Sequence, residues 1–148
     1  MATTLASIHN VDVEAVGLGG FSKSEDYIQR QIRQWGRQYQ ANRDLFRIVH
    51  MDELLRWLPT KAPVTARIGL VHGDFRLDNI IFDKDSLQPL AVLDWELSAL
   101  GDAMCDVAYN CMNFLFPPSI PSLGGVFGLD LTALGIPVCD RISLLLWL

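Results

Sequence analysis

A dense group of polar residues follows a short apolar run at residues 70–79, which read LVHGDFRLDN. The apolar residues before His72 predict a buried strand, and Asp74 and Asn79 follow it at a spacing of five. Polar side chains at the end of a buried strand are costly unless they have hydrogen-bond partners or a function. The run therefore indicates a functional loop carried by a buried strand, and this limits the folds that the chain can adopt.

Two further apolar runs, NIIFD at 79–83 and PLAVLDW at 89–95, flank the turn sequence KDSLQ and predict a β-hairpin. Asn79 begins its first strand and Asp94 ends its second, so we expect the two side chains to lie close together. A carboxylate and an amide oxygen suit Mg²⁺, which takes few protein ligands and fills its shell with water and phosphate oxygens. Asp74 would face this metal site without binding it, placed to take a proton from a substrate hydroxyl during phosphoryl transfer.

Helical periodicity covers much of the remaining chain. Apolar residues recur at helical spacing after Ser24, a plausible N-cap, and again over 44–58, where Pro59 is expected to end the helix and the apolar side chains are expected to form core. A third helix is predicted over 102–115, with Asp102 at or near its N-cap. Residues 1–23 resemble the end of a helix closed by a glycine-rich turn, and the chain after Phe116 is predicted to be loop.

The composition is that of one globular domain of 148 residues, half of them apolar. Three cysteines without a C-x-x-C pair indicate a reducing, intracellular compartment; the cytoplasm is the default, and peroxisome and mitochondrion stay open. Neither a targeting peptide nor an apolar run long enough to span a membrane is visible.

The net charge of −5 is concentrated in one segment. Residues 74–106 contain eight acidic and two basic side chains, so this segment carries −6 and the rest of the chain +1. Nucleic acid is therefore an unsuitable partner for this face, since phosphate backbones need a basic surface. A bound cation explains such a segment more easily.

The motif His-x-Asp-x-x-x-x-Asn at residues 72–79, followed by a strand ending in Asp-Trp-Glu at 94–96, resembles the aminoglycoside phosphotransferase and choline kinase group. With GDAMCDVAY at 101–109 added, the sequence is most similar to the kinase-like domain fused to acyl-CoA dehydrogenases. The close similarity covers about residues 65–112. It implies an α+β fold, namely the mostly helical large lobe of a protein-kinase-like fold with a small β-hairpin.

The resemblance also implies roles for individual residues. Asp74 matches the catalytic aspartate, and Asn79 and Asp94 match the two Mg²⁺ ligands of an ATP-dependent enzyme. Arg76 is a candidate contact for the transferred phosphoryl group, although an ordinary surface arginine remains the alternative.

Two residues are expected to support this loop. His72 is interpreted as a structural residue that ties the loop down rather than as a base. Asp106 is either a partner of the loop or a solvated helix residue.

Parts of the kinase-like pattern are missing from the sequence. Gly17 and Gly19 fit the first two positions of a phosphate-binding loop, but Ser22 occupies the third, and none of the three lysines lies in an apolar strand. We therefore expect the small N-terminal lobe to be absent, residues 1–137 to form a partial domain, and 138–148 to be a divergent apolar tail. A truncated isoform of this kind would expose apolar surface, which predicts poor solubility or a protein partner.

Two functions remain open from the sequence. The first is an ATP- and Mg²⁺-dependent phosphotransferase domain acting on a small-molecule hydroxyl, such as a hydroxyacyl-CoA, present here as a fragment that is inactive alone. The alternative is a non-catalytic kinase-like fragment with a regulatory or interaction role. A metal-dependent hydrolase is disfavoured because the three histidines form no metal-binding pattern.

Overall fold

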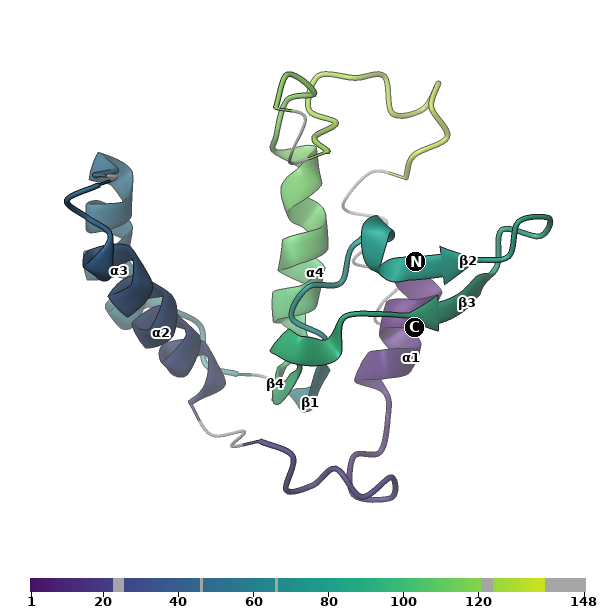
Figure 1. Ribbon diagram of the computed structural model, residues 1–148, viewed down its shortest axis with the longest axis horizontal. Coiled ribbons are helices and arrows are strands. Elements are labelled where there is room, and N and C mark those ends of the chain that lie inside the picture. Colours follow the sequence, from purple (N-terminus) through teal and green to yellow (C-terminus); the bar gives the residue numbers. More distant parts are fainter. Residues whose placement is uncertain (23–25, 46, 66, 121–123, 138–148) are drawn as a thin grey trace.

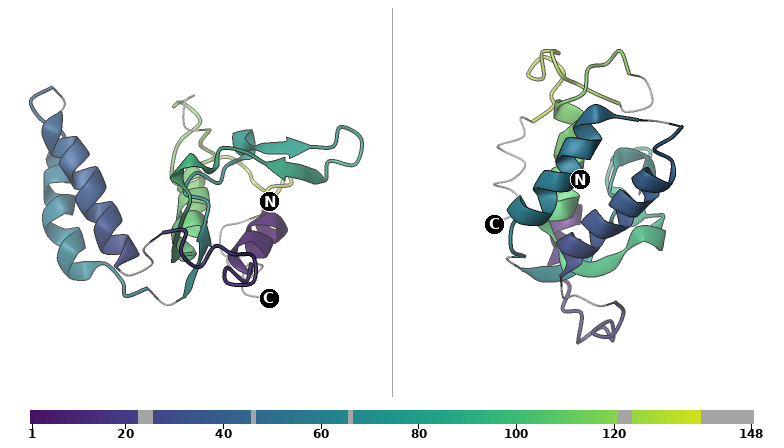
Figure 2. Two further views of the ribbon diagram at one scale, coloured as in Figure 1. Left: turned by 60° about the horizontal axis from the view of Figure 1, so that its bottom comes forward. Right: turned by 90° about the vertical axis from the view of Figure 1, so that its left-hand side faces the viewer.

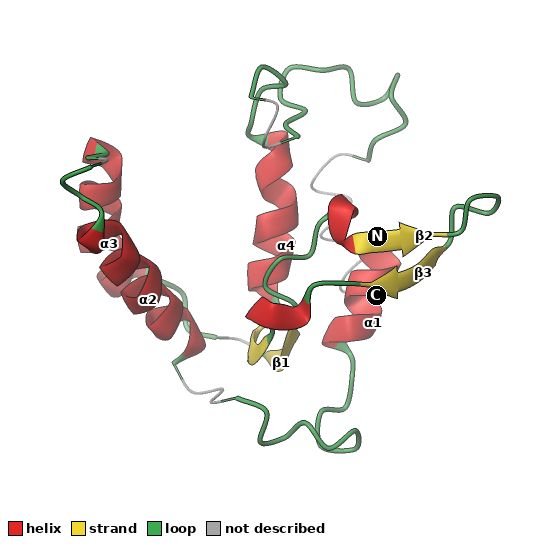
Figure 3. Cartoon of the chain, in the orientation of Figure 1, coloured by secondary structure: helices red, strands yellow, loops and turns green. Residues whose placement is uncertain are grey.

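The computed structural model describes residues 1–22, 26–45, 47–65, 67–120 and 124–137 (Figure 1). Within these residues, four α-helices, four short strands and three 3₁₀ turns make an α+β fold (Figure 3). In chain order the elements are α1 (Ala2–His9), α2 (Tyr27–Ala41), α3 (Val49–Lys61), β1 (Ile68–Val71), η1 (Leu77–Asn79), β2 (Ile80–Phe82), β3 (Pro89–Val92), η2 (Trp95–Leu97), β4 (Ala99–Asp102), α4 (Met104–Cys111) and η3 (Met112–Phe114).

The strands form two antiparallel pairs. The predicted hairpin is β2–β3, in which Ile80 lies opposite Val92. The second pair joins β1 to β4, with Leu70 opposite Leu100. The sequence analysis did not predict β4, whose four residues ALGD show no strand-like alternation and gain their pairing from a partner about 30 residues earlier.

The core lies where β1, β4, α1 and α4 meet. Its buried side chains are Leu5, Ile8, Leu70, Phe75, Ile80, Leu100 and Val107. Full burial of a side chain of this kind contributes about 1.5–3 kcal/mol. Phe75, only 1% exposed, belongs to the polar loop after β1, so the core anchors that loop directly.

The α2–α3 pair projects from this core as a helical hairpin (Figure 2). Gly36 on α2 allows the close approach of the Leu55 side chain on α3, since a Cβ there would lie 2.9 Å from Leu55 Cδ2. At its base the buried ring of Tyr27 lies against Gly101 of β4, where there is no room for a Cβ. The hairpin is thus joined to the core mainly at one end.

Two predictions about this hairpin are wrong. Helix α3 continues through Pro59 to Lys61, because a proline so near the C-terminus removes only part of the last turn's hydrogen bonding. Its apolar side chains are not core, since none of the described α3 residues is buried and Trp57 is 55% exposed. The predicted N-cap Ser24 lies outside the described residues, and α2 begins after Asp26.

The remaining boundaries differ by a few residues. Helix α4 begins at Met104, and Asp102 ends β4 while its carboxylate accepts a hydrogen bond from the Met104 N–H at 2.9 Å. None of the helices in the described parts of the chain is long and apolar enough to cross a membrane.

Candidate active site

The polar loop at residues 72–75 turns sharply after β1. Gly73 has φ +86°, a backbone conformation that favours glycine. A Cβ at this position would lie 2.6 Å from the carbonyl oxygen of Leu97, so the loop also packs tightly against η2. The glycine is therefore required by both the backbone and the packing.

His72 connects this loop to the hairpin. It is fully buried, and its Nε2–H donates to the Leu93 carbonyl at 2.9 Å, while its Nδ1 accepts from the Asp74 N–H at 3.2 Å. A carbonyl only accepts and an N–H only donates, so the ring is a neutral imidazole protonated at Nε2. The Trp95 ring lies 4.6 Å away between centroids. These contacts fit a structural residue.

Asp106 holds the other side of the loop. Its Oδ2 accepts from the His72 N–H at 2.8 Å and its Oδ1 from the Gly73 N–H at 2.8 Å. The same Oδ2 contacts Nε2 of His9, the last residue of α1, at 3.0 Å. Since Asp106 is 1% exposed, the interpretation of a solvated helix residue is wrong.

Asp74 is positioned by two neighbours. The Tyr109 hydroxyl donates to its Oδ1 at 2.7 Å, and the Asn79 amide donates to its Oδ2 at 3.0 Å. The hydrogen bond to Asp74, together with burial, raises the pKa of Tyr109 above its ordinary value. With its side chain 23% exposed, Asp74 can be reached from solvent.

Tyr109 was missed by the sequence analysis. It lies three residues after Asp106, and that spacing places the two side chains on one face of α4. Asn110, next along the helix, donates to the Phe75 carbonyl at 2.6 Å. Helix α4 thus contacts each of the four loop residues.

Asn79 and Asp94 both lie at the open end of the hairpin, where Asn79 is opposite Leu93, the residue before Asp94. The Leu93 N–H donates to the Asn79 carbonyl at 2.8 Å, extending the β2–β3 ladder by one pair. Asp94 is two residues beyond β3 rather than its last residue, in a left-handed conformation with φ +65°. An aspartate tolerates this conformation better than most residues, and such strain is common at functional sites.

The donor set fits a magnesium ion. The Asn79 amide nitrogen donates to the Asp74 backbone oxygen at 2.9 Å as well as to its carboxylate, so the amide oxygen is the atom left for a cation. The exposed Asp94 carboxylate makes no cap hydrogen bond to η2. Among the described residues no cluster of three or more His, Cys, Asp and Glu side chains could hold a metal ion, and Mg²⁺ needs only one or two protein oxygens beside phosphate.

Arg76 is held mainly by a residue other than Asp74. Its Nη2 lies 2.8 Å from Asp78 Oδ2, whereas its Nε lies 3.9 Å from Asp74 Oδ2. The charge of Asp78, followed by that of Asp74, raises the pKa of Arg76. The guanidinium is exposed beside the loop, paired with two carboxylates.

A cleft of about 470 Å³ opens beside the loop, between the base of α2 and helix α4. The residues that line it include Gly73, Asp106 and Tyr109 from the site together with Gln31, Trp35 and Glu96. A small molecule in this cleft would lie next to Tyr109, whose hydroxyl donates to Asp74.

The described geometry is a loop with a solvent-accessible carboxylate on Asp74, together with the oxygen-bearing side chains of Asn79 and Asp94 at the end of the hairpin. Residues 1–128 match the Phosphotransferase enzyme family, and the chain belongs to this family.

Named relatives agree with this assignment. Acyl-CoA dehydrogenase family member 10 of Mus musculus is 48% identical over 95% of this chain and 13% of that protein. Probable acyl-CoA dehydrogenase IBR3 of Arabidopsis thaliana is 43% identical over 77% of the chain, and acyl-CoA dehydrogenase family member 11 of Gallus gallus is 42% identical over 82%. The chain spans only 13–16% of these relatives.

Solved structures share the fold. A Ralstonia eutropha protein, provisionally assigned as an aminoglycoside phosphotransferase, superposes with a TM-score of 0.89 at 41% identity, over 98% of this chain and 44% of that one. Macrolide 2′-phosphotransferase type I superposes with a TM-score of 0.56 at 20% identity, over 98% of this chain and 48% of that one. At that identity the second likeness shows the fold alone.

Proposed function

We propose that this chain carries the catalytic loop of an ATP- and Mg²⁺-dependent phosphotransferase that acts on a small-molecule hydroxyl. The position of Asp74 carries the proposal: hydrogen bonds from Tyr109 at 2.7 Å and Asn79 at 3.0 Å orient its carboxylate while it stays reachable. Membership of the Phosphotransferase enzyme family supports the reaction class.

Each site residue has a role in the proposed reaction. Asp74 accepts the proton of the substrate hydroxyl while that oxygen bonds to phosphorus and the bond from phosphorus to the leaving phosphate oxygen breaks. Asn79 and Asp94 would hold the Mg²⁺ ion, which when bound neutralises charge on the phosphates. Arg76 can contact the transferred group once it turns away from Asp78.

The names of the relatives support a proposal about the substrate, and the family resemblance supports one about the extent of the domain. Several are named acyl-CoA dehydrogenases, and this favours a hydroxyl on an acyl-CoA, such as a hydroxyacyl-CoA. We assign residues 1–137 to part of the large lobe of a kinase-like fold and 138–148, outside the described residues, to a divergent tail. This chain should bind Mg²⁺–ATP through the metal held by Asn79 and Asp94. Turnover would also require the small lobe of a longer protein to position the phosphates, so this chain alone should be inactive.

The alternative is a non-catalytic kinase-like fragment that binds another protein. The apolar face of α3 favours it, because Val49, Leu54 and Trp57 are 57%, 40% and 55% exposed. Exposed apolar residues in one place are typical of interaction surfaces.

A thermal melt of the 148-residue chain tests the proposal. We expect Mg²⁺–ATP, but not ATP without Mg²⁺, to raise the melting temperature, and Asp94→Asn to abolish the increase. Asparagine tolerates the left-handed backbone at this position, so the variant should fold. Asp85→Asn is the matched control, since this aspartate lies in the exposed hairpin turn.

Either of two results would reject the phosphotransferase site. An equal increase in Asp94→Asn would mean that the nucleotide binds elsewhere. A wild-type melt that is indifferent to Mg²⁺–ATP would favour the non-catalytic alternative.

A further inference from the structure

The α2–α3 hairpin is strongly basic within an acidic chain. Residues 27–61 contain seven Lys and Arg against three Asp and Glu, a net charge of +4. The total is −5, so the remaining residues carry −9. The charge on the hairpin therefore opposes that of the rest of the molecule, and an anionic ligand would be attracted to it.

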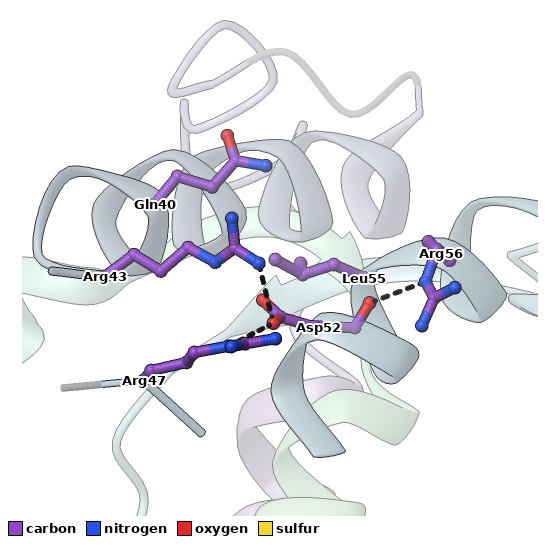
Figure 4. A pocket seen from close by; sticks show the side chains of 6 residues that line it. All are labelled: Gln40, Arg43, Arg47, Asp52, Leu55 and Arg56. Carbon is purple, nitrogen blue, oxygen red and sulfur yellow. Dashed lines mark hydrogen bonds and ion pairs between the residues drawn. The ribbon is translucent and has the colours of Figure 1, made fainter. Parts of the chain in front are cut away.

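A cavity of about 450 Å³ lies between these two helices near their connection. Gln40, Arg43, Arg47, Asp52, Leu55 and Arg56 line it. Figure 4 shows the Arg43 and Arg47 side chains reaching Asp52 from one side, with Arg56 on the other. None of the loop residues 72–75 lines this cavity, so it is separate from the site around Asp74.

Two of the three guanidinium groups share one carboxylate. Arg43 Nη2 lies 2.8 Å and Arg47 Nε 3.5 Å from the same oxygen, Asp52 Oδ2. Arg56 Nε donates instead to the Asp52 backbone oxygen at 3.2 Å, an uncharged acceptor. The hydrogen bond from Arg43 lowers the pKa of Asp52, which keeps that carboxylate ionised. The lining of the cavity therefore carries a charge of +2.

The residues around the cavity do not neutralise this positive charge. Tyr39, on α2, shares its hydroxyl between Ile48 and Asp52. Glu53, the other acidic residue on α3, has its Oε2 3.4 Å from Nδ1 of His50 and lines a different hollow. Asp44 lies in the exposed connection and does not line the cavity.

We propose that this cavity binds the phosphate monoester group of a small molecule. A monoester carries close to −2 at neutral pH, which matches the charge of the lining, and the planar fork of arginine suits phosphate oxygens. Arg43 and Arg47 side chains are 48% and 68% exposed, so they can turn from Asp52 toward an incoming anion. The cavity is larger than a phosphate group, which leaves room for the carbon skeleton against Leu55.

NMR titration of the ¹⁵N-labelled 148-residue chain tests this assignment with glycerol 3-phosphate and inorganic phosphate as probes. We expect saturable shifts of the Arg43, Arg47 and Arg56 Nε–H signals. Arg43→Gln with Arg47→Gln should weaken binding at least tenfold. Arg33→Gln with Arg37→Gln, which removes the same charge from exposed positions on α2 outside the cavity, should leave affinity within twofold.

The charge of the ligand gives a second readout. The second pKa of a phosphate monoester is about 6, so raising the pH from 5.5 to 7.5 should tighten binding by roughly fourfold. Dimethyl phosphate, a diester that stays at −1, should bind more weakly and without this increase. The diester also controls for His50, a titratable residue that lines the neighbouring hollow.

Several outcomes would overturn the proposal. An equal loss of affinity in the two double variants would show general attraction of the anion to a basic surface. A diester that binds as tightly as the monoester would rule out recognition of the dianion. A phosphoserine peptide that binds at least tenfold more tightly than glycerol 3-phosphate would assign the surface to a protein partner. Arg47→Gln alone, at a position 68% exposed, keeps the test valid if the double variant does not fold.

Discussion

At the scale of single residues, Gly73 should be the least replaceable position in the loop. Gly73→Ala places an alanine in a left-handed backbone conformation and brings its Cβ too close to the Leu97 carbonyl oxygen. We therefore expect the free energy of unfolding to fall by about 3 kcal/mol or more. Gly128→Ala is the control, because its φ is +84° and no atom lies within 4 Å of the added Cβ. That change should cost about 1 kcal/mol. Urea denaturation measures both, and equal losses would contradict the packing argument.

Tyr109 and Asp74 provide a second test at this scale. The hydrogen bond to the Asp74 carboxylate is the main cause of the raised pKa of Tyr109, so Asp74→Asn should lower that pKa toward its usual value of about 10. Titration of ¹³C-labelled tyrosine by NMR measures the change. In Asp78→Asn, where the altered residue contacts Arg76, the pKa of Tyr109 should change much less. The absence of any decrease in Asp74→Asn would mean that the two groups are not bonded in solution.

At the scale of elements, α4 determines the shape of the loop at residues 72–75. Asp106 accepts two backbone N–H groups and contacts the His9 ring, whereas an asparagine offers one acceptor oxygen in place of two. We expect Asp106→Asn to lower the free energy of unfolding by about 3 kcal/mol, because a buried N–H loses its acceptor. Asp102→Asn, where the carboxylate accepts from the Met104 N–H near the helix start, should cost about 1 kcal/mol.

Chemical denaturation of the two variants and of the wild type compares these losses. Similar effects of Asp102→Asn and Asp106→Asn would show that Asp106 merely caps its own helix and does not organise the loop.

At the scale of the whole molecule, the contact between the α2–α3 hairpin and the core should respond to alkali. Burial raises the pKa of Tyr27 to about 12 and that of Cys105 to about 11. In the unfolded chain these two groups ionise near their ordinary pKa values. Their contribution to the free energy of unfolding is therefore fully present below the ordinary pKa values and is lost as the pH rises through the raised pKa values of the folded state. For Tyr27 the window is about pH 10–12 and the loss is on the order of 2 kcal/mol.

Tyr27→Phe keeps the ring against Gly101 and removes the ionising hydroxyl. The variant should therefore lose less stability than the wild type between about pH 10 and 12, as measured by urea denaturation at several pH values. Parallel curves for the two proteins would show that this hydroxyl is accessible to water in the folded state.

The local parts of this protein follow from its sequence. Apolar residues at helical spacing identify α2, the apolar runs around KDSLQ identify the β2–β3 hairpin, and the motif around Asp74 identifies the family. Each of these is encoded by residues a few positions apart, where spacing alone decides which side chains share a face. The proposed roles of Asp74, Asn79 and Asp94 were also reached from spacing and resemblance.

The residues that hold the loop in place are identified only by the tertiary structure. His9 meets Asp106 across 97 residues, and Tyr109 meets Asp74 across 35, so no local pattern reveals either contact. Strand β4 exists because β1 supplies its hydrogen-bond partners. The α3 apolar face stays exposed because α2 is the main element against which α3 packs in the described parts of the chain. The sequence thus determined which chemical groups the loop contains, and tertiary packing determined their orientation, since burial and pairing depend on residues far apart in the chain.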